Sequence, residues 1–295
     1  MRIFVTGASG FVGSAIVQDL LSAGHSVLGL ARSDASASKV AALGADVHRG
    51  SLEDMASLRA GIRAADAVIH TAFNHDFSRF LDSCADDRHV IEAMGDELVG
   101  SDRPMVVTAV VAGLAPGRVA IETDQASPAF PRASDLAAAA VADRGVKVTT
   151  VRLPPSTHGA GDTIGFVPHL IRLARETGVS GYMGDGQNRW PAVHRLDAAR
   201  LYRLALENGA LGGPFHAVDD EGIPVKAIAE LIGRRLGLPV RSVKEADGAA
   251  HFGWLAKFMG MDMASSSART RAVLGWAPTQ PGLLVDVDGP AYFGG

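Results

Sequence analysis

The sequence predicts an α/β protein whose core is a doubly wound parallel sheet. Apolar segments of strand length alternate with amphipathic helical segments over the first half of the 295 residues, which is the pattern of repeated strand-helix-strand units. Segment 67–73 is a continuous apolar run, as expected of a strand buried on both faces. In such sheets ligands bind at the carboxyl ends of the strands, so the site is expected there.

The N-terminal stretch Ile3-Phe4-Val5-Thr6-Gly7-Ala8-Ser9-Gly10-Phe11-Val12-Gly13 predicts a strand, a glycine turn and the start of a helix. Gly7 would allow the tight turn, Gly10 would let a pyrophosphate approach main-chain N–H groups, and Gly13 would let the helix pack closely on the strand. An ordinary strand-helix connection is the alternative in a chain with 34 glycines. Strand, turn, helix and next strand nevertheless fall within the ~30 residues of a dinucleotide-binding unit.

The residues after the second predicted strand, 27–30, favour the phosphorylated cofactor. An acidic side chain at this point holds a ribose 2′-OH, whereas an arginine accommodates a 2′-phosphate. Ala31 occupies the acidic position and Arg32 follows it, so NADP(H) is favoured over NAD(H), with a solvated arginine as the alternative. The residues expected at the cofactor are Gly7, Ser9, Gly10, Phe11, Val12, Gly13, Arg32, Ser33, Ser51, Leu52, Thr71, Ala72, Phe73 and Pro154.

The remaining elements suggest two regions. Further strands are expected at 46–50, 67–73, 105–108 and 146–153, with helices that begin at Ser51, near Phe77 and at Asp135. Later helices are expected at 166–177, 197–207, 223–236, 249–259 and 267–274. We therefore expect a dinucleotide-binding domain over 1–157 and a mainly substrate-binding region over 158–295, with parts that return to the first domain.

Composition excludes several classes of partner. The net charge of −4 gives no basic field for nucleic acid or an anionic membrane. The single cysteine, Cys84, excludes an internal disulfide and lies in an apolar helical pattern typical of core residues. No apolar segment reaches the ~20 residues that cross a bilayer, and a cytoplasmic location is expected. The predicted helix near 77–98 could face the core or a second copy of the chain in a homodimer.

Four segments together resemble the extended short-chain dehydrogenase/reductases, NAD(P)-dependent reductases, epimerases and dehydratases with a Rossmann fold. They are Thr6-Gly7-Ala8-Ser9-Gly10-Phe11-Val12-Gly13, Val68-Ile69-His70-Thr71-Ala72, Val151-Arg152-Leu153-Pro154 and Val193-His194-Arg195-Leu196-Asp197. The resemblance spans most of the chain. It implies a Rossmann sheet and a nicotinamide cofactor.

The catalytic motif of that family, Tyr-x-x-x-Lys with a preceding Ser or Thr, is missing. The corresponding stretch is Phe130-Pro131-Arg132-Ala133-Ser134-Asp135-Leu136, which places either Pro131 and Asp135 or Arg132 and Leu136 at the two positions. In the family, the tyrosine donates a proton to the carbonyl oxygen and the lysine lowers the tyrosine's pKa. The sequence resembles an atypical, NADP-dependent reductase-like branch.

These observations predict an NADPH-dependent reductase of a small or medium, apolar ketone or aldehyde. A catalytically silent NADP-binding sensor and a nucleotide-sugar epimerase or dehydratase are the alternatives. Arg132 could polarise a carbonyl or bind an anionic group, and Ser134-Asp135 also fits an ordinary helix start. The histidines and carboxylates lack metal-ligand spacing, so no metal is expected. Candidate catalytic residues are Thr108, Arg132, Ser134 and Asp135, and candidate substrate-pocket residues are Asn74, Ala109, Val110, Val111, Thr157, His158 and Trp190.

Overall fold

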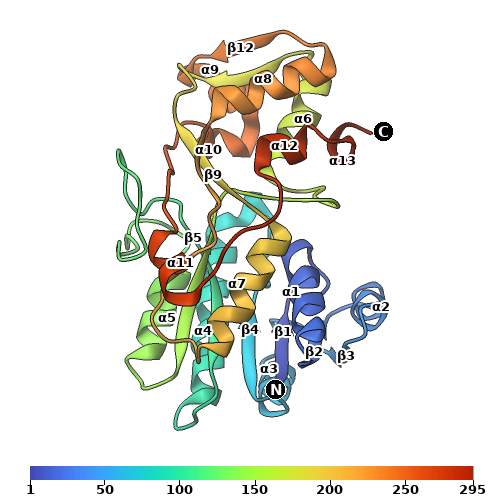
Figure 1. Ribbon diagram of the computed structural model, residues 1–295, viewed down its shortest axis with the longest axis vertical. Helices are drawn as coiled ribbons and strands as arrows, with labels where there is room; N and C mark the ends of the chain where they lie inside the picture. The colour runs from blue at the N-terminus through green and yellow to red at the C-terminus, as the bar shows by residue number, and fades with distance from the viewer. Residues whose placement is uncertain (295) are drawn as a thin grey trace.

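A computed structural model describes residues 1–294 and shows the predicted parallel sheet (Figure 1). Seven strands lie in the order β3-β2-β1-β4-β5-β6-β10, and every neighbouring pair is parallel. This is the doubly wound arrangement, in which the strand order reverses beside β1. The strands are β1 (Arg2–Thr6), β2 (Ser26–Ala31), β3 (Asp46–Arg49), β4 (Ala67–His70), β5 (Met105–Val110), β6 (Val148–Leu153) and β10 (Phe215–His216).

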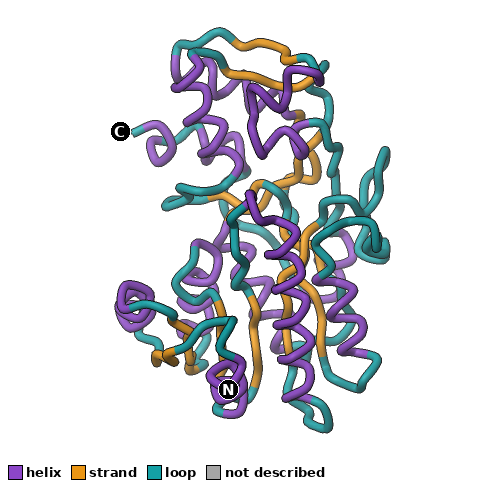
Figure 2. Tube along the Cα trace, turned by 180° about the vertical axis from the view of Figure 1, so that it is seen from behind, coloured by secondary structure: helices purple, strands orange, loops and turns teal. Residues whose placement is uncertain are grey.

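Helices cover both faces of this sheet, and two apolar cores lie between the layers (Figures 1 and 2). On one face α1 and α7 pack against each other, and the buried side chains of Ile3, Val5 and Val151 point toward them. On the other face α3, α4 and α5 pack over Phe4 and Val107. The helices are α1 (Phe11–Ser22), α2 (Asp34–Ala42), α3 (Met55–Arg63), α4 (Phe80–Leu98), α5 (Ser134–Ala142) and α7 (Arg195–Glu207), with a 3₁₀ turn η1 (Phe77–Arg79) before α4.

The second half of the chain builds a smaller region above the carboxyl ends of the strands (Figure 1). Its core includes Trp190, Phe252 and Leu255, which are fully buried. Its sheets are β7-β9-β11 and β8-β12, namely β7 (Ser156–His158), β8 (Ser180–Met183), β9 (Arg189–His194), β11 (Asp220–Pro224) and β12 (Val240–Val243). Its helices are α6 (Phe166–Thr177), α8 (Val225–Leu236), α9 (Glu245–Phe252), η2 (Gly253–Leu255), α10 (Ala256–Met259), α12 (Leu283–Val287) and α13 (Pro290–Phe293), whereas α11 (Ala268–Leu274) packs against β10 at the edge of the large sheet.

Parts of the second half return to the sheet. α7 packs beside α1, β10 extends the sheet next to β6, and the indole N–H of Trp276 donates to the carbonyl of Asp197 at 2.9 Å. The boundary expected between 157 and 158 falls inside β7. The substrate-facing region is therefore tied to the sheet at several points, and this fixes its position over the strand ends.

Several predicted element boundaries are corrected by local hydrogen bonding. The helix expected from Ser51 begins at Met55, because the carboxylate of Asp54 accepts from the N–H of Ser57 at 3.0 Å and caps it. The strand expected over 67–73 ends at His70, because the hydroxyl of Thr71 donates to the carbonyl of Thr6 and the chain leaves the sheet.

In the second half, Ile223 and Pro224 belong to β11 rather than to the following helix. The segment 249–259 comprises the end of α9, η2 and α10, and the positive φ of Gly253 at 57° interrupts the helix there.

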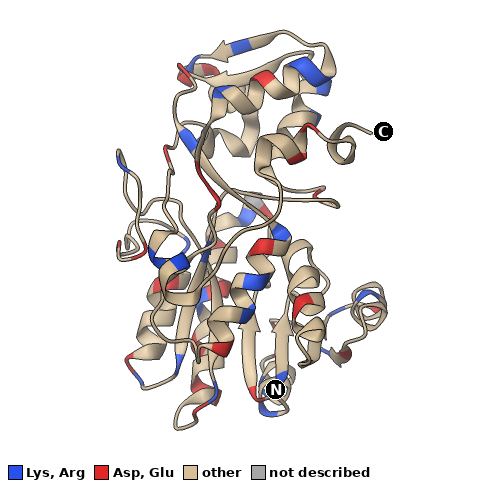
Figure 3. Cartoon of the chain, in the orientation of Figure 1, with Lys and Arg blue, Asp and Glu red and all other residues tan. Residues whose placement is uncertain are grey.

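Charged side chains are interspersed over both regions (Figure 3). Within residues 1–294, none of the helices combines the length and apolar character that a membrane span requires.

We predict that Gly13→Ala destabilises the fold. An ideal Cβ on Gly13 would lie 2.0 Å from the carbonyl oxygen of Gly7, so α1 would have to move away from β1. We expect the free energy of unfolding in urea to fall by about 3 kcal/mol. Gln18→Ala, at an exposed position of the same helix, should change it by less than about 0.5 kcal/mol. Equal stability of Gly13→Ala and the wild type would contradict the close contact.

Candidate functional site

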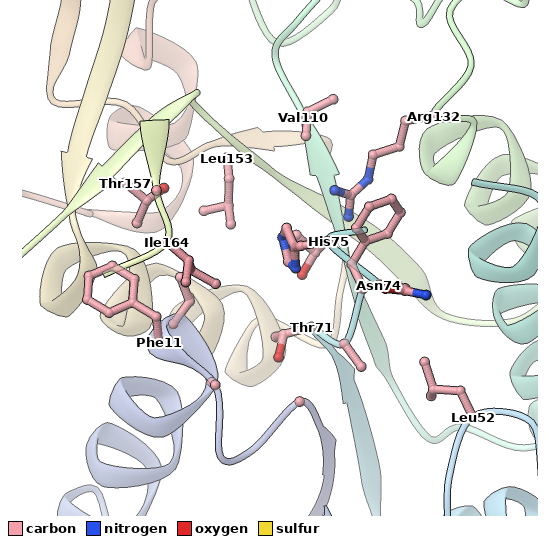
Figure 4. Close-up of a pocket in the computed structure, with 18 of the residues that line it drawn as sticks. Phe11, Leu52, Thr71, Asn74, His75, Val110, Arg132, Leu153, Thr157 and Ile164 are labelled. Atoms are coloured by element: carbon pink, nitrogen blue, oxygen red, sulfur yellow. The ribbon is translucent and has the colours of Figure 1, made fainter. Parts of the chain in front are cut away.

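A cavity of about 610 Å³ lies at the carboxyl ends of the central strands and is roofed by the second region. Figure 4 shows Arg132 and Val110 on one side, Phe11, Thr157 and Ile164 on the other, and His75 between them. The cavity brings together most of the predicted site residues. Those that line it are Gly7, Ser9, Gly10, Phe11, Val12, Gly13, Arg32, Ser51, Leu52, Thr71, Ala72, Phe73, Asn74, Thr108, Val110, Arg132, Pro154 and Thr157.

The glycine turn forms one wall of the cavity. Gly7 adopts a φ of 71°, and a Cβ there would lie 2.6 Å from the hydroxyl of Thr71. The N–H of Gly10 donates to the carbonyl of Gly7 at 2.8 Å, and α1 begins at the next residue without a side-chain cap. The first N–H groups of α1 therefore face the cavity. This set of donors, together with the helix dipole, suits a pyrophosphate.

The end of the cavity beside β2 and β3 is lined by one basic and one acidic side chain. Arg32, Ser36 and Glu53 line it. A hydrogen bond from Ser51 and, to a smaller extent, the charge of Arg32 lower the pKa of Glu53. Ser33 instead caps α2 through the N–H of Ser36 at 3.2 Å and does not line the cavity, which corrects its predicted role.

A chain of buried hydrogen bonds runs beneath the other end. The Thr6 hydroxyl and Nδ1 of His70 are 2.8 Å apart, and Nε2 of His70 lies 3.2 Å from Oδ1 of Asp87. The Ser134 hydroxyl donates to the other carboxylate oxygen of Asp87 at 2.6 Å, and Nε of Arg132 donates to that hydroxyl at 3.3 Å. Because a carboxylate only accepts, His70 donates through Nε2. We call these five residues the buried chain.

Asp87 stays ionised within the buried chain. Burial raises the pKa of its carboxyl, but the hydrogen bonds from His70 and Ser134 and the charge of Arg132 outweigh it and hold the pKa below its usual value. A buried carboxylate is tolerated only when it is paired in this way. The negative charge therefore lies below the cavity, and the arginine reaches into the cavity.

Arg132 and His75 are the polar groups at the centre of the cavity. The guanidinium of Arg132 stacks 4.0 Å above the ring of Phe73. The ring of His75 contacts Phe73 edge-on, with centroids 5.3 Å apart. Removal from bulk water lowers the pKa of His75, and the charge of Arg132 lowers it further, against a smaller opposite effect of the Phe73 backbone. The histidine is therefore mainly neutral at pH 7.

Apolar side chains close the rest of the cavity. Val110 and Leu153 line it from the ends of β5 and β6, while Phe166, Phe258 and Met263 line it from the second region. Phe166 and Phe258 also pack against each other, with ring centroids 5.2 Å apart. This wall leaves few hydrogen-bonding groups beside His75 and Arg132, which favours an apolar ligand body near the strand ends.

Comparison with known proteins places the chain in a family. Residues 7–176, more than half of the chain, match the family described as NAD(P)H-binding. The chain belongs to this family. It is 48% identical over 296 residues to Uncharacterized protein C2A9.02 of Schizosaccharomyces pombe, across 99% of this chain and 100% of that protein.

More distant proteins extend the comparison. A ketoreductase of Stigmatella aurantiaca, named for 4-hydroxy-2-methyl-3-oxo-4-farnesyl-3,4-dihydroquinoline-1-oxide, is 29% identical over 271 residues, with 86% of this chain and 80% of that protein covered. The crystal structure of DesIV, a dTDP-glucose 4,6-dehydratase of Streptomyces venezuelae with NAD and TYD bound, has a TM-score of 0.79 at 21% identity, over 99% of this chain and 96% of that chain. The fold is thus that of the extended short-chain dehydrogenase/reductases, as predicted.

Four predicted pocket residues lie away from the cavity because side chains alternate along a strand. Thr108 and Val110 of β5 face the cavity, whereas Ala109 is buried behind them and Val111 lines a separate hollow of about 230 Å³. In β7, Thr157 faces the cavity and His158 turns away to pair with Asp286 at 2.8 Å.

Trp190 of β9 is likewise fully buried in the core of the second region. It packs against Phe166, with ring centroids 5.4 Å apart. It therefore supports the cavity wall from behind.

Two predicted catalytic residues also have other partners. Asp135 accepts from Thr150 at 2.6 Å and pairs with Arg152 at 3.0 Å, so it joins α5 to β6. Ser134 belongs to the buried chain and does not line the cavity. Thr108 lines it, but its hydroxyl donates to the carbonyl of His70 and lies 2.7 Å from the hydroxyl of Tyr202. Neither Ser134 nor Asp135 can reach a ligand in the cavity.

The sequence alone did not reveal several lining residues. The sequence predicts Glu53 in the first turn of a helix, whereas α3 begins two residues later and Glu53 lines the cavity. Asp162 and Phe258 come from the second half, where no motif marks them. His75 lies in the loop after β4, and a position near a strand end is the one signal in the sequence that marks it. Cys84 is buried as expected, and burial raises the pKa of its thiol to about 11. In the described part of the chain no three potential metal ligands cluster.

Asp162 yields a pH-dependent prediction. It lines the cavity, accepts from the N–H of Gly165 at 2.9 Å and lies 3.5 Å from the hydroxyl of Tyr292. Burial raises the pKa of its carboxyl from 3.8 to about 6, against the lowering effect of these hydrogen bonds. The folded state therefore binds this proton more tightly than the unfolded state, and stability is lost as the pH rises from about 4 to about 6.

Asp162→Asn removes this titration. We expect its advantage in free energy of unfolding over the wild type to grow by about 1 to 3 kcal/mol between pH 4 and pH 7, as measured by urea unfolding at each pH. Asp143→Asn, at an exposed carboxylate, is the control and should follow the wild type. A constant difference between Asp162→Asn and the wild type across this range would contradict the prediction.

Proposed function

We propose that this NAD(P)-binding oxidoreductase transfers a hydride from NADPH to the carbonyl carbon of a ketone or aldehyde. One observation carries the proposal: the cavity runs from the glycine turn to an apolar chamber at the ends of β4, β5 and β6. The turn, with positions where a Cβ would collide, suits the pyrophosphate. The chamber has room for a substrate beside the nicotinamide. The ketoreductase of Stigmatella aurantiaca supports this reaction class.

The residues of this chain would mainly position the cofactor and the substrate, and they would contribute less to acid-base catalysis. Gly10 and the N-terminus of α1 would hold the pyrophosphate, while Thr71, Pro154 and Leu153 would face the nicotinamide half. A bound NADPH would supply the hydride, and the carbonyl oxygen would then take its proton from water. None of the tyrosines Tyr182, Tyr202 and Tyr292 lines the cavity within residues 1–294. The missing tyrosine removes general-acid help that is worth about 10² to 10⁴ in rate, which makes a slow reductase the expectation.

The absent acid-base pair weighs against epimerase or dehydratase chemistry. Those reactions require proton transfer at specific sugar carbons or oxygens. In this cavity the wall beside Arg132 is formed by Val110, Leu153 and Phe73. A single hydride step needs only a carbonyl held close to the nicotinamide, and such a wall can provide that.

The test is NADPH oxidation, followed at 340 nm, with a panel of ketones, aldehydes and enones. We expect turnover with medium-sized apolar ketones and equal amounts of NADP⁺ and alcohol. Val110→Asp, which places a charge in the apolar wall, should lower kcat/KM for these ketones by at least about tenfold. Tight NADPH binding without oxidation by any compound would overturn the reductase proposal and favour the silent sensor.

Cofactor choice should depend on Arg32. Its guanidinium lines the end of the cavity where a ribose 2′-phosphate would lie, beside Ser36. Arg32→Asp should reverse the preference from NADPH toward NADH by at least about 100-fold in relative kcat/KM, because it replaces an attractive charge with a repulsive one. Arg88→Asp, a surface change of the same charge on α4, is the control. An unchanged NADPH preference in Arg32→Asp would contradict the assignment.

A further inference from the structure

We propose that Arg132 is a carboxylate-binding residue, so that the preferred substrates are oxo acids, carbonyl compounds that carry a carboxylate. This inference rests on the proposed reductase function and names its substrate class. Three observations support the proposal. They are the contacts of the guanidinium, the buried chain that holds the guanidinium in place, and the apolar side chains that surround it.

The guanidinium of Arg132 is held in place from behind. Its Nε donates to the hydroxyl of Ser134, which is 1% exposed, and its Cζ lies 4.0 Å from the centroid of the Phe73 ring. Ser134 in turn is fixed by Asp87 and His70. In Figure 4 the terminal nitrogens of Arg132 point toward His75 and the middle of the cavity. A side chain immobilised in this way loses little entropy when it binds a ligand.

The partners of Arg132 differ from those of the structural arginines in this protein. Arg152 pairs with Asp135 at 3.0 Å, Arg189 with Asp262 at 2.7 Å and Arg203 with Asp19 at 2.6 Å. Arg132 contacts a hydroxyl and an aromatic ring. Across residues 1–294 no carboxylate is within ion-pair distance of it. A half-buried guanidinium without a carboxylate within ion-pair distance favours binding of a ligand that carries an anionic group.

The positive charge also acts on the groups around the chamber. It contributes to the lowered pKa of His75 and of Asp87, and it opposes the burial that raises the pKa of Cys84. Asp87 lies beneath and already accepts from His70 and Ser134. Among residues 1–294, the carboxylates that line the cavity are Glu53, beside Arg32, and Asp162, which accepts from the N–H of Gly165. The field near Arg132 is therefore positive on the cavity side.

A carboxylate fits this position better than a phosphate. The planar fork of one guanidinium matches the two oxygens of a carboxylate. A phosphate dianion would need more donors than the apolar side chains of Phe73 and Val110 can supply. The phosphates of the cofactor have their own donors at the glycine turn and at Arg32. Arg132 thus remains for the substrate, and the chamber beside Leu153 would hold the carbonyl end.

The test compares matched substrates within each variant. The pairs are 2-oxo and 3-oxo acids and their methyl esters, and the quantity is the ratio of kcat/KM for the acid to that for the ester. We expect the wild type to favour the acid by about 10- to 100-fold. Arg132→Met should bring the ratio to about one, and Arg132→Lys should retain part of the preference. Arg88→Met, the same change of charge on the surface, should keep the wild-type ratio.

Ser134→Ala tests the buried chain as a positioning device. It leaves the charge of Arg132 in place and frees its Nε, so the acid-to-ester ratio should fall by about threefold to tenfold, mainly through KM for the acid. Circular dichroism and thermal unfolding establish that each variant is folded. An acid-to-ester ratio near one in the wild type, or an unchanged ratio in folded Arg132→Met, would overturn the carboxylate-binding proposal. Turnover of the esters in the same experiment would still support the reductase function.

A binding experiment separates the two proposals if no turnover is found. Butanoate, which carries a carboxylate but no carbonyl to reduce, is titrated by calorimetry into the NADPH-loaded protein. Binding by the wild type and Arg88→Met that is lost in Arg132→Met supports the carboxylate site without any catalysis. Absence of binding in the wild type, or equal binding by Arg132→Met, overturns it.

Discussion

The contact between Gly13 and the carbonyl of Gly7 is the constraint on which the site depends. Because Gly13 has no Cβ, α1 approaches the end of β1 more closely than any other residue would permit. That approach directs the first N–H groups of α1 into the cavity, and it also brings the turn against Thr71 at the end of β4. The close contact between Gly13 and Gly7 thus fixes the positions of both the N–H groups of α1 and the end of β4.

The buried chain imposes the second constraint. Burial of the Asp87 carboxylate is unfavourable unless it is fully hydrogen-bonded, so β4, α4 and α5 must keep the positions that bring His70 and Ser134 to it. Thr6 links the same chain to β1, directly before the glycine turn. The residues that present Arg132 and those that present the phosphate donors therefore share one framework. A change in the buried chain would therefore alter the positions of both Arg132 and the phosphate donors.

Local sequence predicted the parts of the site that depend on backbone geometry. The glycine turn, Arg32, and Thr71 followed from spacing alone, and the structure places all of them on the cavity wall. The pairing of Asp135 with Arg152 could not be predicted, because it depends on how α5 lies over β6. The predicted helix start at α5 is confirmed, but Ser134 and Asp135, which the sequence predicts as catalytic residues, do not line the cavity. Because successive side chains of β5 point to opposite faces of the sheet, Ala109 is buried and does not form part of the predicted cavity wall.

The second region was the hardest to predict, because its contribution is steric. Phe166 and Phe258 lie far apart in the sequence and meet only when α6 and α10 pack together above the strands. Nothing in either segment distinguishes a core aromatic from one that lines a ligand cavity, since both require the same apolar face.

The segment in which the resembling family carries its tyrosine supplies Arg132 in this chain, and an arginine does not combine the two tasks of a tyrosine. A phenol both orients a carbonyl and donates its proton, whereas a guanidinium orients anions strongly and remains protonated. In the proposed reaction Arg132 would therefore add binding energy to a substrate without adding acid catalysis, and this energy would hold the substrate in one orientation against the nicotinamide face. In a chamber with apolar walls, such orientation is the main way in which the protein can favour hydride transfer. The buried chain would contribute to the proposed hydride transfer for this reason, although its members Asp87 and Ser134 lie outside the cavity.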